Sequence, residues 1–159
     1  MAKRHPALIA LSHDHHHALA LALSCRKHAL GQIRPGDATA VQEQAARVQA
    51  FFQESLVPHF AAEEKILFPL MLAESPGAKT MVDGLLREHE RLRRDVASLD
   101  GKASLQRALF DLGDLLESHV RTEERELFAL FERTVPPSLA EKAGREIEKI
   151  LASSPARSG

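Results

Sequence analysis

The chain has 159 residues, 21 of them basic and 22 acidic, which gives a formal net charge of −1. This length suits one domain with a substantial core, and the balanced charge indicates no general attraction to nucleic acid or to an anionic membrane. No apolar run approaches the ~20 residues that a membrane span needs. The apolar stretch near the start is too short for a secretory signal, so we expect a cytoplasmic protein.

Histidine is the unusual residue of this composition. There are nine histidines, and five of them lie between His5 and His17. Cys25 is the only cysteine, and tyrosine and tryptophan are absent. An intrachain disulfide, a thiolate metal cluster and a tyrosyl radical are therefore excluded, and we expect Cys25 to be a small apolar residue of a helix.

Apolar positions at helical spacing predict four long helices. These helices cover residues 6–30, 37–73, 77–99 and 102–133, and a shorter fifth helix covers 138–152. Short connections between long helices favour an all-α, up-down-up-down four-helix bundle with a short C-terminal fifth helix. We expect one domain over residues 1–152 and a disordered tail over 153–159.

Several residues are typical of helix ends. Pro6 and Pro76 suit first turns, Asp37 suits an N-cap, and Ser138 with Glu141 could form a capping box. Pro58 and Pro69 both lie inside the second predicted helix. Each removes a backbone donor, so we expect each to kink that helix or to end it.

One histidine–carboxylate pattern occurs twice, as HFAAEEKILF at 59–68 and HVRTEERELF at 119–128. Residues four apart lie on the same face of a helix, so His59 pairs with Glu63 and His119 pairs with Glu123. Leucines and phenylalanines beside both pairs indicate that this face is the interior. Buried imidazoles and carboxylates are costly unless something satisfies them, and a cation does so directly.

The other two long helices each carry a histidine one turn after a leucine, in LSHDH at 11–15 and LLREH at 85–89. The four helices together would present four imidazoles and two carboxylates. These side chains could hold two ions, with two imidazoles for each ion and both carboxylates shared as bridges. Such a ligand set suits iron or manganese, and zinc is also possible. Calcium and magnesium prefer oxygen ligands alone.

The order H…HxxxE…H…HxxxE over residues 8–131 resembles the hemerythrin-like family, also called the HHE cation-binding domain. This resemblance implies two iron ions with an oxo or hydroxo bridge and with Glu63 and Glu123 as bridging carboxylates. The metal ligands that it implies are His15, His59, Glu63, His89, His119 and Glu123.

The resemblance also implies a function. It indicates a non-heme di-iron protein that senses or handles oxygen, redox state, nitric oxide or iron. Its partners would be small molecules such as dioxygen, nitric oxide or peroxide. We expect it to bind neither nucleic acid nor a membrane. A sensor of this size would need a separate signalling partner.

Several alternatives stay open. His16 could replace His15, and Glu124 could replace Glu123. Arg93 stands where hemerythrins carry a further histidine, which implies an open position, a water-filled position or a compensating ligand at one ion. We expect the histidines outside the site to face solvent, namely His5, His13, His17 and His28.

Two other functions compete with the sensor. The chain could be a di-iron oxidase or peroxidase, or a structural bundle held by zinc. The sequence has no Gly-rich phosphate loop and no nucleophile paired with a base, which favours a metal-binding module over a dedicated enzyme. It also lacks the inward Glu-x-x-His pairs that are typical of ferritin-like bundles.

Overall fold

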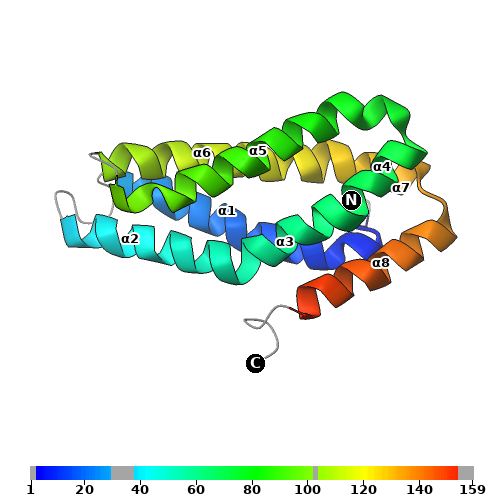
Figure 1. Ribbon diagram of the computed structural model, residues 1–159, viewed down its shortest axis with the longest axis horizontal. Coiled ribbons are helices and arrows are strands. Elements are labelled where there is room, and N and C mark those ends of the chain that lie inside the picture. The colour runs from blue at the N-terminus through cyan, green and yellow to red at the C-terminus, as the bar shows by residue number, and fades with distance from the viewer. Residues whose placement is uncertain (1–2, 30–37, 102–103, 154–159) are drawn as a thin grey trace.

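The computed structural model describes residues 3–29, 38–101 and 104–153, and these residues form an all-α bundle without strands (Figure 1). The expected N-cap Asp37 and nearly all of the expected disordered tail lie outside the described residues. Among the described residues, no helix is both long and apolar enough to cross a bilayer.

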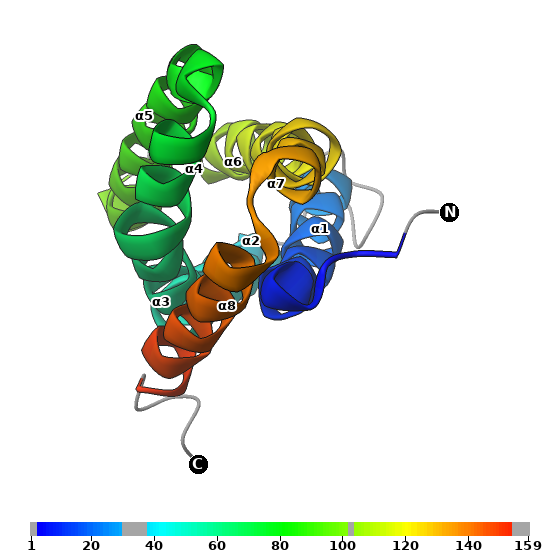
Figure 2. The same ribbon diagram turned by 90° about the vertical axis from the view of Figure 1, so that its right-hand side faces the viewer.

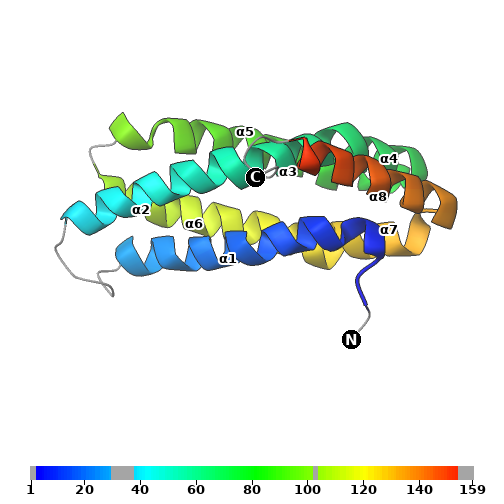
Figure 3. The same cartoon turned by 90° about the horizontal axis from the view of Figure 1, so that it is seen from below.

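Four helical columns run along the long axis (Figures 1 and 3). The first column is the 3₁₀ turn η1 (Pro6–Leu8) and α1 (Ile9–Ala29). The second is α2 (Ala38–Phe51), η2 (Phe52–Leu56), α3 (Val57–Ala62), η3 (Glu63–Leu67) and α4 (Phe68–Glu74). The third is η4 (Pro76–Ala78), α5 (Lys79–Ala97) and η5 (Leu99–Gly101). The fourth is α6 (Leu105–Thr122), η6 (Glu123–Leu127) and α7 (Phe128–Thr134), and α8 (Pro137–Ala152) follows it.

The columns pack as the sequence predicts. Helix α1 lies against α6 and α2, and α5 lies against α6 and α4, so successive columns are antiparallel neighbours. Seen from its end, the bundle is a ring of four columns, with α8 crossing beside η1 and α3 (Figure 2). Ala140, Ile147 and Leu151 of α8 are buried in the core. The predicted four-helix bundle with a C-terminal fifth helix is confirmed.

The second column continues past both of its internal prolines. Pro58 and Pro69 each follow a π-helical turn, η2 and η3 respectively. In η3, the backbone N–H of Phe68 donates to the carbonyl of Glu63, five residues earlier. Because a proline ring crowds the preceding turn, this wider turn lets the helix accommodate it.

A third π turn, η6, occurs where there is no proline. It begins at Glu123, as η3 begins at Glu63, and Phe128 N–H closes it on the Glu123 carbonyl. The wide turns therefore coincide with the two repeated glutamates as well as with prolines. Such turns are common at functional sites because the added residue changes which side chains face inward.

The start of α8 differs from the prediction. The helix begins at Pro137 with Pro136 as its N-cap, and no side chain caps it, so Ser138 and Glu141 form no capping box. Proline suits the first helical position because its missing N–H would have no partner there anyway. The helix therefore starts one residue before the expected position.

Two apolar clusters fill the bundle interior, one on each side of a layer of buried polar residues. One cluster includes Leu8, Leu11, Leu67, Phe68, Leu85, Leu127 and Phe128. The other includes Ala18, Ala22, Leu56, Phe60, Leu92, Leu112 and Leu116. In every column the polar residues lie in sequence between members of the two clusters, so the polar layer crosses the middle of the core.

We predict that Gly113→Ala destabilises the fold, because α1 and α6 approach each other closely there. A Cβ atom at Gly113 would lie 2.8 Å from the Ala22 carbonyl oxygen and 3.2 Å from Cys25 Cβ. Overpacking of this kind costs about 1–3 kcal/mol in free energy of unfolding. Denaturant titration followed by circular dichroism would measure that loss.

Gly84→Ala provides the matched control. The nearest atom to a Cβ there is the flexible Arg87 Nη2, at 3.9 Å. Alanine should stabilise this helical position by about 0.5–1 kcal/mol. Equal effects of the two substitutions would contradict the tight α1–α6 contact.

Candidate metal centre

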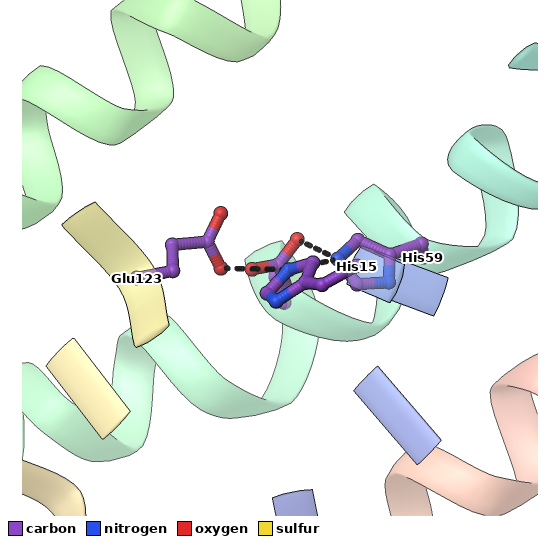
Figure 4. Close-up of side chains that lie close together, drawn as sticks. His15, His59 and Glu123 are labelled. Carbon is purple, nitrogen blue, oxygen red and sulfur yellow. Dashed lines mark hydrogen bonds and ion pairs between the residues drawn. The ribbon is translucent and has the colours of Figure 1, made fainter. Parts of the chain in front are cut away.

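Six side chains from all four columns meet in the polar layer. They are His15 of α1, His59 of α3, Glu63 of η3, His89 of α5, His119 of α6 and Glu123 of η6. Each is between 0% and 2% exposed. Figure 4 shows His15, His59 and Glu123 directed toward one another from three columns.

These side chains form two groups that share both carboxylates. One group is His15, His59, Glu63 and Glu123, and the other is His89, His119, Glu63 and Glu123. Within each group, one nitrogen or oxygen atom of every residue lies within 4.8 Å of the others. Each group could therefore hold one metal ion, with Glu63 and Glu123 reaching both.

The inward atoms of this layer contact mainly one another. His59 Nε2 lies 2.9 Å from Glu63 Oε1, and His119 Nε2 contacts Glu123 Oε1. Apart from such contacts within the layer, no hydrogen-bond partner is found in the described part of the chain for the carboxylate oxygens of Glu63 and Glu123 or for Nε2 of His89. The Nε2 atoms of His15 and His59 face each other at 3.1 Å. Buried carboxylates and imidazoles that face mainly one another are costly, and one cation in each group would satisfy them. The donor set thus fits a metal.

The opposite nitrogen of every central histidine contacts a carboxylate from a neighbouring column. The Nδ1–carboxylate pairs are His59–Asp14, His89–Glu64 and His119–Glu88, each at 2.9 Å, and His15–Glu124 at 2.8 Å. The pairs form a closed ring, because each column supplies one carboxylate and one histidine. We call Asp14, Glu64, Glu88 and Glu124 the outer carboxylates.

The outer carboxylates fix how the imidazoles can act. An ionised carboxylate only accepts hydrogen bonds, so Nδ1 of each histidine must be the donor. In a neutral imidazole, Nε2 then keeps its lone pair, and in each of these histidines Nε2 faces the centre. This arrangement is typical of metal-binding histidines, whose orientation and basicity depend on such partners.

Sequence reasoning missed the outer carboxylates, although each stands next to a central residue. Asp14 and Glu88 directly precede His15 and His89, and Glu64 directly follows Glu63. Glu124 was considered only as a replacement for Glu123. The doubled acidic residues were the available signal, but their partners lie on other columns and depend on how the helices pack.

Two arginines hold two of the outer carboxylates from outside. Arg93 Nη2 donates to Glu64 at 2.6 Å, and Arg4 Nη2 donates to Glu124 at 2.8 Å. Arg93 also pairs with Glu90 at 2.5 Å. Arg93 therefore acts on the central layer through Glu64 and His89, one layer away from the candidate metal positions.

The ionisation of the outer layer follows from these contacts. Burial opposes charge on Glu64, but hydrogen bonds from His89 and Arg93 outweigh it and lower the pKa of Glu64. Burial also opposes charge on Glu124, but hydrogen bonds with His15 and Ser12, together with the charges of His15 and Arg4, outweigh it and lower the pKa of Glu124. Burial lowers the pKa of His15 and of His89, which favours the neutral imidazole that a metal requires.

In the inner layer, neighbouring charges act strongly on one another. Burial, and next the charge of Glu123, raise the pKa of Glu63 well above its usual value. Burial also opposes charge on Glu123, but His119 lowers the pKa of Glu123 well below normal. Burial lowers the pKa of His119, but the nearby carboxylates of Glu123, Glu88 and Glu63 outweigh this effect and raise the pKa to about 10. One imidazolium thus compensates one carboxylate in this layer.

The structure separates the alternatives at α1 and η6. His15 is buried in the polar layer while His16 is exposed, and Glu123 points inward while Glu124 contacts His15. His13 and His17 are exposed, as expected. His5 is half-buried, because its Nδ1 caps η1 by accepting from Ala7 N–H. The side chain of His28 lies outside the described part of the chain.

The chain belongs to the hemerythrin family, since the sequence profile of the hemerythrin HHE cation-binding domain matches residues 7–133. This confirms the family resemblance. No curated protein and no solved structure matches the chain. The family assignment and the two histidine–glutamate groups support metal binding. The roles of the six central residues as ligands stay a prediction.

We predict that Glu124→Gln weakens metal binding about 10–100-fold, the usual effect of losing such a partner of a ligating histidine. The amide would leave His15 Nδ1 without an ionised acceptor, although Glu123 stays in place. Competition against a chelator of known affinity would measure the change. Glu126→Gln is the control, because Glu126 is exposed on the same turn. Equal effects of both substitutions would contradict the orienting role of Glu124.

We also predict that metal uptake releases at least one proton per chain at neutral pH. The pKa of His119, raised to about 10 without a metal, makes this histidine an imidazolium that must lose its proton to ligate. Metal affinity should therefore rise with pH up to that value. Calorimetry in buffers of different ionisation enthalpy would count the protons. Uptake without proton release would show that His119 does not ligate.

Proposed function

We propose that this chain binds two iron ions in the polar layer and uses them to sense or handle a small molecule such as dioxygen, nitric oxide or peroxide. His15 and His59 would hold one ion, His89 and His119 would hold the other, and Glu63 and Glu123 would reach both. The observation that supports this best is the pair of groups sharing both carboxylates. Mixed imidazole and carboxylate donors suit iron, while manganese and zinc are the competitors.

An iron pair supplies one-electron redox chemistry and sites for small ligands. The chain's own residues would control both. The outer carboxylates orient the imidazoles, and the apolar clusters on both sides keep water away from the layer. Because the six central side chains are at most 2% exposed, only a small molecule could reach them without a large rearrangement.

The surroundings of Arg93 bear on the open position that we propose beside His89. The Phe60 ring stacks on His89 with their centroids 3.8 Å apart, and the Arg93 guanidinium lies 5.5 Å from the Phe60 centroid. Arginine stays protonated and cannot ligate. This ion would therefore have one histidine fewer than in hemerythrins, and its neighbourhood would be apolar. These features support a protein that senses or handles a small molecule rather than one that carries oxygen reversibly.

We predict about two iron ions per chain for protein purified without chelators or affinity-tag metal. Elemental analysis would measure this. Glu63→Ala or Glu123→Ala should remove both ions, since each carboxylate reaches both groups. Replacing the exposed neighbour Glu126 by alanine is the control and should leave the iron content unchanged. A stoichiometry of one would contradict the dinuclear proposal.

The second experiment separates the possible functions. Adding iron(II) without oxygen and then admitting air should oxidise the iron once, visible in near-ultraviolet absorption. The chain has no tyrosine or tryptophan to obscure that region. A single slow oxidation supports sensing or storage. Repeated turnover of a reductant or of peroxide would replace the proposal with an oxidase or peroxidase. A reversible oxygen adduct would indicate an oxygen carrier. Tight binding of zinc in place of iron would indicate a structural bundle.

A further inference from the structure

Two histidines outside the polar layer face each other on the surface of α1. His13 and His17 are one helical turn apart, and both are exposed. Their Nε2 atoms lie 3.3 Å apart, while their ring centroids lie 4.9 Å apart at an interplanar angle of 82°. The rings therefore do not stack, and they turn their Nε2 atoms toward a common point.

This spacing fits two nitrogens bound to one metal ion. Zinc–imidazole bonds of about 2.0–2.1 Å at a tetrahedral angle place the two nitrogens about 3.3–3.4 Å apart. The buried pair His15 and His59 has a similar Nε2 separation, 3.1 Å. Because the surface pair is already in this arrangement, an ion would bind with little rearrangement of the helix.

We propose that His13 and His17 form a second, mononuclear metal site, which takes Zn²⁺ or Cu²⁺ with two imidazole ligands. Exposed imidazoles suit these two ions, and copper binds such donors most tightly in the divalent series. His17 also lines a surface groove with Ser24, Arg47 and Ser55, so water can complete the coordination. This site shares no residue with the central layer and does not depend on iron being bound there.

Three variants separate this pair from its neighbours. His13→Ala and His17→Ala each remove one of the two ligands. His16→Ala is the matched control, because His16 is an exposed histidine of the same turn. Alanine is the most favourable residue for a helix, so none of the substitutions should unfold α1.

Copper titration of the full chain, followed by electron paramagnetic resonance and by metal analysis, tests the proposal. The double variant His13→Ala/His17→Ala should bind one copper ion fewer than the native chain, whatever metal the interior holds. Each single variant should bind that copper about 100-fold more weakly, since linking two donors gains at least this much. His16→Ala should match the native chain.

Two results would overturn the proposal. One is equal copper stoichiometry in the native chain and the double variant. The other is a loss in His16→Ala as large as the losses in His13→Ala and His17→Ala, which would indicate unspecific binding by the histidine-rich turn. Failure of the two-iron proposal would appear separately, as low iron content in every variant including the native chain.

Discussion

The structure depends on one constraint, which is that a full layer of ionisable side chains must be buried across the middle of a helical bundle. Carboxylates and imidazoles lose hydration there and need partners. The Nδ1–carboxylate bonds supply part of this need, and each joins two neighbouring columns, as His59 joins α3 to Asp14 of α1. The same bonds therefore orient the imidazoles and fix how the columns are rotated relative to one another. The two apolar clusters pack on either side of this layer.

The layer is nearly twofold symmetric, and its departures from symmetry distinguish the two candidate ion positions. His15 stacks near Phe128 and His89 near Phe68, with similar centroid distances of 5.4 and 5.5 Å. His89 also has Phe60 against it at 3.8 Å. The arginines differ too, because Arg93 belongs to α5 whereas Arg4 precedes η1. His89 thus contacts two phenylalanine rings, whereas the outer carboxylate of His15, Glu124, is held by Arg4 of the N-terminal segment.

The sequence predicted the columns and two of the histidine–glutamate pairings, because both follow from local spacing, but it left His16 open beside His15 and Glu124 open beside Glu123. The backbone of a helix sets which residues share a face, so His59 with Glu63 and His119 with Glu123 could be paired without knowing the fold. The outer carboxylates could not be placed in this way, since the Glu64–His89 pair depends on how two columns are rotated. The π turns at Glu63 and Glu123 were also outside the reach of periodicity. Each of them adds one residue to a helical turn, whereas the spacing of apolar residues in the sequence predicts a regular α-helix there.

Two histidine pairs, one within α1 and one between α1 and α3, show what the fold adds to the residues themselves. His13 with His17 and His15 with His59 present nitrogens at similar separations, 3.3 and 3.1 Å. The buried pair has oriented tautomers, carboxylates within reach and little access to water, so an ion held there would meet several fixed donors and exchange slowly. The surface pair has two donors and open solvent. It would bind by the general affinity of imidazole and exchange readily. Burial and the outer carboxylates, more than the histidines, therefore distinguish the central layer from the surface pair.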